Sequence, residues 1–339
     1  MRPHHVRGDN IPLRGALGVG SIRAETVLLR TMIDILHDDL DNDGPRIWAI
    51  GGGKGGVGKS VLAANLGVVL AKRRQRVVVV DADLGGANLH TLFGMPDPEL
   101  TLSDYLDRKV PSLDDIASST SVPGLHLVSG ANALLEMANP KHGQKSRILR
   151  HIQQLDADHV ILDLGAGTGI NVLDFFLVSH CGILVVVPEP TSVENAYHFI
   201  KAAFARKLKQ TEPRKKIAAA LEKLAADHSG TGSKSARDLV TGVVAIDPEA
   251  GAAVLAAAAT FAASIVVNRA SSASHERLGA EMSMACREYY GIGVDALGTL
   301  PTDPMVARSV LDREPVAAVH PDSPFAKAVR RLSSGLKGE

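Results

Sequence analysis

The residues with the clearest chemistry in this chain lie in the stretch Gly53-Lys54-Gly55-Gly56-Val57-Gly58-Lys59-Ser60. It matches G-x-x-x-x-G-K-[ST], the pattern of loops that cradle nucleotide phosphates. Its glycines allow successive backbone N–H groups to converge on phosphate oxygens. Lys59 is expected to reach the β- and γ-phosphates, and the Ser60 hydroxyl to bind Mg²⁺. The stretch therefore predicts a site for ATP or ADP with Mg²⁺.

Two flanking elements must hold this loop in place. The apolar run 47–50 before it predicts a short buried strand, and the apolar spacing over 61–74 after it predicts a helix. A helix starting at the loop adds the positive end of its dipole to the phosphate site. Strand, loop and helix together form the context that the motif requires.

Two further apolar runs end in acidic residues. The run 76–80 leads into Asp81 and Asp83, and the run 159–162 leads into Asp163. Such continuous runs are typical of parallel strands covered by helices on both faces. The second has the Walker B pattern, so Asp163 is expected to hold a water of the Mg²⁺ shell.

The second lysine of the loop, Lys54, distinguishes it from an ordinary phosphate loop. The pattern K-G-G-x-G-K-[ST] resembles the deviant Walker A motif of the MinD/ParA family of P-loop ATPases. The resemblance implies that Lys54 reaches across an ATP-dependent homodimer to the partner's phosphates. The alternative is a solvated lysine beside the loop.

The stretch 81–89 resembles the family's switch I. The resemblance implies that Asp83 orients the attacking water, that Asp81 lies near the Mg²⁺ shell, and that Asn88 contacts the nucleotide or the switch. A carboxylate at a strand end near the γ-phosphate fits the chemistry of phosphoryl transfer. The alternative is that one of the two acids caps the next short helix.

Two more stretches resemble the FlhG (FleN) branch of the family. In the glycine-rich run 164–169, which resembles switch II, the sequence is Gly-Ala-Gly, although Leu164 stands where that branch usually has threonine. In the second, Pro188-Glu189-Pro190-Thr191, the threonine is predicted to cap a helix over 192–208, with Glu194 completing a capping box.

Two segments near the C-terminus resemble the family's base-binding elements. Asn268, at the end of the predicted strand 263–269, resembles an adenine-reading asparagine, and Arg269, which follows it, is also predicted to contact the nucleotide. An Asx turn is the alternative for Asn268. The loop Pro301-Thr302-Asp303-Pro304 resembles the loop on the other side of the base, so Pro301 and Asp303 are predicted to contact the nucleotide.

The implied fold is a doubly wound, mostly parallel α/β sheet with helices on both faces, spanning 46–335. Before it we predict a disordered tail over 1–20 and an amphipathic helix over 21–40. We expect this helix to pack on the ATPase body, with partner binding as the alternative. A helical insertion is predicted over 206–260, and a short final strand over 315–319.

Basic residues gather in the predicted insertion, at Arg206-Lys207, Lys209 and 214–216. A solvated helix face is the first interpretation, and contact with nucleic acid or an acidic partner is the second. The C-terminal stretch 323–336 spaces apolar residues as an amphipathic helix with a basic face. We expect it to pack on the domain, with a membrane anchor as the alternative.

Composition excludes several classes of function. The 37 basic residues balance the 37 acidic ones, so no global field attracts nucleic acid, which is not expected as a partner. The two cysteines are far apart, which argues against a disulfide framework, zinc site or metal cluster. There is no long apolar stretch and no signal-peptide core, so we expect a cytoplasmic protein. Any membrane association should be weak and peripheral, at the membrane or cell pole.

The resemblance implies slow ATP hydrolysis by a dimer that forms on ATP, acting as a spatial or regulatory switch, as FlhG proteins do for flagellum number and position. An unidentified protein partner would bind through the 21–40 helix or the insertion. One alternative is a scaffold that binds nucleotide without hydrolysing it. The other, a metal-cluster carrier of the same superfamily, needs paired cysteines.

Overall fold

The computed structural model describes residues 44–83, 86–130, 142–226 and 236–336. The predicted tail 1–20 and helix 21–40 lie outside these residues. The strands are β1 Arg46–Gly51, β2 Val77–Ala82, β3 Ala117–Ser119, β4 Leu125–Val128, β5 His159–Leu164, β6 Cys181–Val186, β7 Ala263–Ala270 and β8 Asp295–Pro301. The helices are α2 Lys59–Ala71, α3 Leu89–Leu92, α4 Leu102–Leu106, α5 His142–Ile152, α6 Ile170–Leu177, α7 Pro190–Gln210, α8 Arg214–Ala226, α9 Ala236–Ile246, α10 Pro248–Ala259, α11 Ala273–Tyr290, α12 Pro304–Asp312, α13 Val316–Val319 and α14 Pro324–Ser334, with a 3₁₀ turn at Asp114–Ile116.

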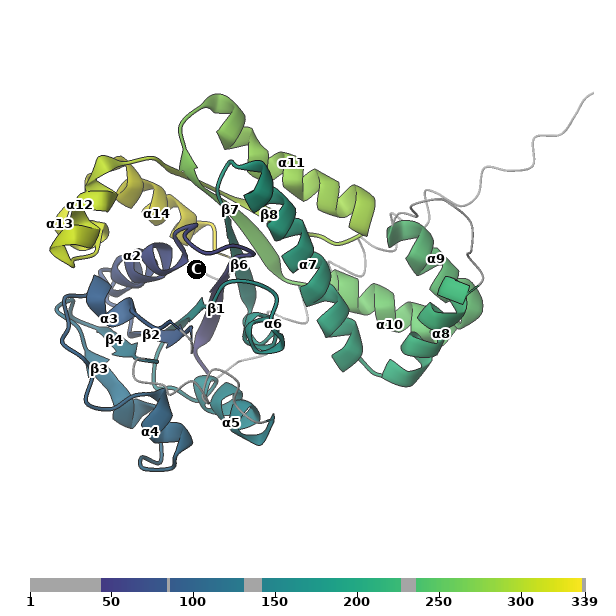
Figure 1. Ribbon diagram of the computed structural model, residues 1–339, viewed down its shortest axis with the longest axis horizontal. Coiled ribbons are helices and arrows are strands. Elements are labelled where there is room, and N and C mark those ends of the chain that lie inside the picture. The colour runs from purple at the N-terminus through teal and green to yellow at the C-terminus, as the bar shows by residue number, and fades with distance from the viewer. Residues whose placement is uncertain (1–43, 84–85, 131–141, 227–235, 337–339) are drawn as a thin grey trace, which may run out of the picture. The chain divides into compact units, whose positions relative to one another are not determined.

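The described strands form one sheet in the order β3-β4-β2-β5-β1-β6-β7-β8. Every neighbouring pair is parallel except β3 and β4, where the three-residue edge strand β3 runs antiparallel. The doubly wound, mostly parallel fold predicted from the sequence is therefore confirmed (Figure 1). Because β2, β5 and β1 are neighbours, the loops and acids at their carboxyl ends meet at one edge of the sheet.

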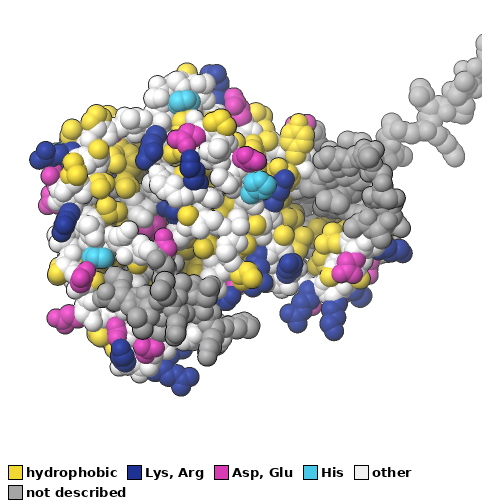
Figure 2. Space-filling model, in the orientation of Figure 1, with side chains coloured by type: hydrophobic (Ala, Val, Ile, Leu, Met, Phe, Trp, Pro, Cys, Tyr) yellow, Lys and Arg dark blue, Asp and Glu magenta, His cyan; other side chains and the backbone are white. Residues whose placement is uncertain are grey.

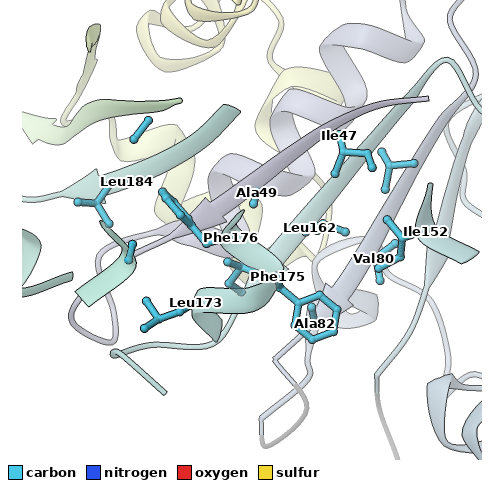
Figure 3. Packing of buried hydrophobic residues seen from close by; sticks show 14 of the residues in the cluster. Ile47, Ala49, Val80, Ala82, Ile152, Leu162, Leu173, Phe175, Phe176 and Leu184 are labelled. Carbon is cyan, nitrogen blue, oxygen red and sulfur yellow. The ribbon is translucent and has the colours of Figure 1, made fainter. Parts of the chain in front are cut away.

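Alternate residues of each central strand face opposite layers of helices. In β1, Ile47 and Ala49 lie in the layer formed with α4, α5, α6, α7 and α11, while Trp48 and Ile50 lie in the layer with α2, α3, α13 and α14. Figure 3 shows the first layer, where Leu173, Phe175 and Phe176 of α6 lie among side chains of the central strands. This burial on both faces explains why the strands read as continuous apolar runs.

The structure tests two predictions for the C-terminal part of the chain, the strand over 315–319 and the helix over 323–336. Residues 316–319 form the short helix α13, so the predicted final strand over 315–319 is wrong. Asn65 Oδ1 accepts a hydrogen bond from the Ala317 N–H, and Lys72 donates to the carbonyl of Ala317, which fixes this turn against α2. In α14 the apolar residues Phe325 and Val329 are buried against α2 and β8, which confirms a packed terminal helix.

The 206–260 segment consists of the end of α7 and of helices α8, α9 and α10, which pack against one another. Its apolar side chains, including Ile217, Val243 and Val254, form a small cluster separate from the two layers on the sheet. Lys and Arg side chains gather over the corner between α7 and α8 (Figure 2). The segment extends the domain without interrupting its sheet.

Candidate functional site

The phosphate-loop stretch 53–60 joins β1 to α2, as predicted. Gly56 and Gly58 have φ angles of 74° and 97°, in the left-handed region that disfavours side chains. Gly58 is the residue before α2, and Lys59 begins the helix with its side chain buried. The loop is thus positioned by the strand and the helix that the sequence pattern requires.

Gly53 is held against the first turns of α7. A Cβ atom at Gly53 would lie 2.3 Å from the carbonyl oxygen of Asn195, so only glycine fits there. On the other side, the switch II residue Gly167 donates a backbone hydrogen bond of 3.1 Å to the Gly52 carbonyl. The loop therefore contacts both α7 and switch II.

Asp81 and Asp163 lie on neighbouring strands and are register partners between β2 and β5. Their exposed fractions are only 1% and 2%. Burial raises the pKa of Asp163 to about 8, and the nearby Asp81 adds to the rise, against a hydrogen bond from Ser60 and the charge of Lys59. Burial also raises the pKa of Asp81 to about 6, against backbone hydrogen bonds from Leu89 and Asp83.

The two carboxylates differ in the hydrogen bonds that they accept. Asp81 accepts hydrogen bonds from the backbone N–H groups of Leu89 and Asp83, at 2.9 and 3.2 Å. In contrast, Asp163 Oδ1 is buried and accepts no hydrogen bond from any described residue. A buried carboxylate oxygen needs a cation or donor, so the pair, with the Ser60 hydroxyl, fits Mg²⁺ and its water shell.

Asp83 lies close to switch II. A Cβ atom at Gly165 would be 3.0 Å from Asp83 Oδ1, so the carboxylate rests against the backbone just after β5. Asn88 is exposed and precedes α3, and its side chain does not cap that helix. The structure thus brings Asp83 near Asp163, whereas Asn88 stands outside this buried pair.

At the end of β7, Asn268 and Arg269 contact the phosphate loop itself. Asn268 Nδ2 donates a hydrogen bond of 2.8 Å to the Val57 carbonyl, and Asn268 Oδ1 accepts one from the Arg269 N–H. Arg269 has a φ of 57° and donates from Nη2 to the Gly56 carbonyl at 3.1 Å. Both residues lie beside the predicted site.

The loop after β8 has a structural role in its own right. Asp303 is buried; it caps α12 by accepting from the Met305 N–H, and it accepts from the Phe325 N–H at the start of α14. Pro301 ends β8 and is half-buried. The Asp303 carboxylate therefore joins two helices, a role that its sequence context did not reveal.

Lys54 is engaged within its own subunit. Its Nζ lies 2.8 Å from Glu189 Oε2 and 3.4 Å from the Thr191 hydroxyl. Helix α7 begins at Pro190 with Glu189 as the residue before it, and Thr191 makes no capping bond, so the predicted Thr191–Glu194 capping box is wrong. Proline at the first helical position explains the earlier start.

The sequence did not reveal the buried ionic cluster around Asp174 on α6. Arg206 binds this carboxylate through Nε and Nη2, Gln210 donates at 2.9 Å, and Lys145 from α5 also donates. Lys207 donates to the Thr260 carbonyl at 2.5 Å, and burial lowers its pKa to about 8. Arg206 and Lys207 thus support the packing of α7. The interpretation as a solvated helix face therefore applies only to the remaining basic residues, Lys209 and 214–216.

Helices of the described part of the chain are all too short or too polar to cross a membrane. Among the same residues no group of three or more His, Cys, Asp or Glu side chains is arranged to hold a metal ion. A cation held at the acidic pair would therefore need further ligands, such as the Ser60 hydroxyl and nucleotide oxygens.

Comparison with known families gives a match over most of the chain. Residues 48–316 match the family described as the CobQ/CobB/MinD/ParA nucleotide binding domain. The antiactivator FleN of Pseudomonas aeruginosa is 33% identical over 158 residues, 46% of this chain and 55% of that protein. The flagellum site-determining protein YlxH of Helicobacter pylori is 34% identical over 171 residues, 48% of this chain and 55% of that protein. The matches thus span only about half the length of these two relatives.

A longer match is the ATP-binding protein MJ0547 of Methanocaldococcus jannaschii, 28% identical over 291 residues, covering 86% of this chain and 87% of that protein. Among solved structures, the septum site-determining protein MinD of Pyrococcus horikoshii, complexed with Mg-ADP, has a TM-score of 0.59 at 22% identity. The superposition covers 86% of this chain and 96% of that one. At this identity the structural likeness shows the fold.

Proposed function

The chain belongs to the MinD/ParA family of nucleotide-binding P-loop proteins, near its FlhG branch, and on that premise we propose that it is an ATPase switch. In this proposal it binds ATP with Mg²⁺, dimerises on ATP and hydrolyses it slowly. The name of YlxH, a flagellum site-determining protein, supports a role in controlling the number or position of a flagellum.

One observation carries the proposal: the buried Asp163 oxygen that no described residue satisfies, beside Lys59 and Ser60. Without a cation, this buried group is held largely protonated near neutral pH by its raised pKa, whereas a bound cation would allow it to ionise. Mg²⁺, when bound, would neutralise Asp163 and Asp81 and the phosphate oxygens. The Mg-ADP in the MinD structure of Pyrococcus horikoshii supports the same assignment.

The other residues take roles around this centre. Lys59 and the N–H groups of the loop would bind the phosphates, and Asp83, against switch II, would orient the attacking water. Lys54 would neutralise the partner's phosphates in the dimer, as an arginine finger does. Asn88, Asn268, Arg269, Pro301 and Asp303 are proposed to border the nucleotide.

Two lysine variants test the proposal. Lys59→Ala should abolish ATP binding, because Lys59 contacts phosphates in its own subunit. Lys54→Ala should leave ATP binding by the monomer nearly intact while removing dimerisation and hydrolysis. Calorimetry, light scattering after size-exclusion chromatography in Mg-ATP, and a phosphate-release assay measure the three properties. If Lys54→Ala dimerises and hydrolyses like wild type, the trans-acting lysine is wrong.

A scaffold without hydrolysis is the second candidate, because the 206–260 segment has its own apolar cluster and an exposed basic corner that could face a partner. Wild-type protein that binds ATP and releases no phosphate would favour it. An affinity pull-down with the Asp83→Ala variant in Mg-ATP would then search for the partner. We propose a cytoplasmic location, with placement at the membrane or pole depending on that partner.

A further inference from the structure

The Asn268 amide and the Arg269 guanidinium donate to two successive carbonyl groups of the phosphate loop, those of Val57 and Gly56. The amide also lies directly on the loop, because a Cβ atom at Gly58 would be 2.4 Å from Asn268 Nδ2. Two adjacent residues of β7 thus hold two adjacent peptide groups. We define this arrangement, Asn268 and Arg269 with the carbonyls of 56 and 57, as the β7 clamp.

Peptide geometry gives the clamp a consequence for the phosphates. In a planar trans peptide the C=O and the following N–H point in opposite directions. Fixing the carbonyls of Gly56 and Val57 toward β7 therefore turns the N–H groups of Val57 and Gly58 away from it. Neither of these N–H groups donates to any other residue in the described part of the chain. They remain available for phosphate oxygens.

The backbone at Arg269 supports a positional role. Its φ of 57° is uncommon for a residue with a side chain, and such conformations persist where the surroundings fix them. The guanidinium also lies near Glu189, whose pKa is lowered by Lys54 first and by Arg269 to a smaller extent. Arg269 therefore bonds to the loop and contributes positive charge near the start of α7.

We propose that Asn268 and Arg269 are positioning residues for the triphosphate, acting through the loop's peptide groups independently of the base. This inference rests on the proposed function. It extends that function by separating phosphate binding from base recognition. A residue that only reads adenine would affect ATP and leave a ligand without a base unchanged. A residue that orients the loop would affect both equally.

Inorganic tripolyphosphate with Mg²⁺ is the probe, compared with ATP and GTP by calorimetry. We expect Asn268→Ala and Arg269→Gly each to weaken binding of tripolyphosphate and ATP by a similar factor, about fivefold to tenfold for one hydrogen bond, with the ATP/GTP ratio unchanged. Glycine at 269 keeps the left-handed backbone without strain. Arg108→Gly is the matched control, since Arg108 is also exposed and has a φ of 61°.

The outcomes separate the inference from the proposed function. If Asn268→Ala weakens ATP but not tripolyphosphate, Asn268 is a base reader and the inference is wrong. The inference also fails if Arg269→Gly, at an exposed position where loss of folding is not expected, binds tripolyphosphate like wild type. Wild-type protein that binds neither ATP nor tripolyphosphate would instead overturn the proposed function.

Discussion

Lys54 Nζ and Glu189 Oε2 lie 2.8 Å apart within one subunit, and this ion pair joins the phosphate loop to the residue before α7. Both side chains are about half exposed, at 41% and 51%. In the proposed dimer, Lys54 must leave this partner before it can reach the phosphates of a second subunit. In this proposal the ion pair opposes dimerisation.

Glu189→Gln should shift the monomer–dimer equilibrium in Mg-ATP toward the dimer. Exposed ion pairs are weak, so we expect a change of about two- to fivefold in the apparent dissociation constant. Sedimentation equilibrium measures it. Glu194→Gln, an exposed glutamate on the same helix, is the control. A dimer that weakens in Glu189→Gln would show that Glu189 supports assembly.

Asp83→Ala should stop hydrolysis while keeping ATP bound. Without a carboxylate against switch II to place the water, phosphate release should fall about 100-fold or more, and the dimer should accumulate. Binding and single-turnover assays in Mg-ATP separate the two effects. Asp107→Ala, at an exposed position on another loop, should behave like wild type. Hydrolysis at the normal rate in Asp83→Ala would remove this residue from the catalytic centre.

Replacing residues 211–259 with a short Gly/Ser linker should preserve ATP binding. The segment has a separate apolar cluster, and its removal leaves Arg206 and Gln210 in place on α7. ATP affinity should stay within about tenfold of wild type, or about 1.4 kcal/mol. The cellular role should be lost, if the segment binds the partner. A larger loss of affinity would make it part of the nucleotide site.

Asp174→Asn should destabilise the fold by about 3 kcal/mol, because two cations would lose their buried counter-charge. Burial raises the pKa of Asp174. Hydrogen bonds from Arg206 and Lys145 lower it by a larger amount, so the pKa of Asp174 lies below its ordinary value. Such a group stabilises the fold above its unfolded pKa of about 3.9, and this contribution is lost as the pH falls through the folded pKa.

Urea unfolding at several pH values measures this effect. Wild type should lose more stability than Asp174→Asn between about pH 4 and pH 2. Asp156→Asn, which removes an exposed ion pair with Arg76, should change the free energy of unfolding little at pH 4 and at pH 2. Equal acid sensitivity in wild type and Asp174→Asn would contradict the assignment.

Vesicles of anionic lipid should not bind the protein in Mg-ATP. An interfacial helix needs an apolar face for the bilayer, and in α14 that face is buried against α2 and β8. Co-sedimentation measures binding. Strong ATP-dependent binding that is lost when the exposed Lys327 and Arg330 are changed to glutamate would overturn this expectation.

The sequence was sufficient for features governed by local pattern. Fully buried strands read as apolar runs, and the loop motif required a strand before it and a helix after it, so β1, β2, β5 and α2 could be predicted. The meeting of Asp81 and Asp163 followed from the same rule, because parallel strands end at one edge.

Features set by distant contacts could not be predicted in this way. The valines of 315–319 favour a strand. However, Asn65 of α2 accepts a hydrogen bond from Ala317, and Lys72, just after α2, donates one to it, so the segment is held as a helix. Glu189 was noted only as part of the stretch 188–191, and its contact with Lys54 spans 135 positions. Asp174 gave no local signal, since its partners come from α5 and from the far end of α7.

Helix α7 has 21 residues, and at about 1.5 Å per residue it is a rod roughly 30 Å long. One end touches the phosphate loop through Asn195 and Glu189, and the other enters the 206–260 segment. A protein bound to that segment would be too distant for its side chains to reach the γ-phosphate. Such a protein could affect ATP turnover only through a tilt or shift of helix α7. Gly53, which packs on the Asn195 carbonyl, would then be the first residue of the loop to move.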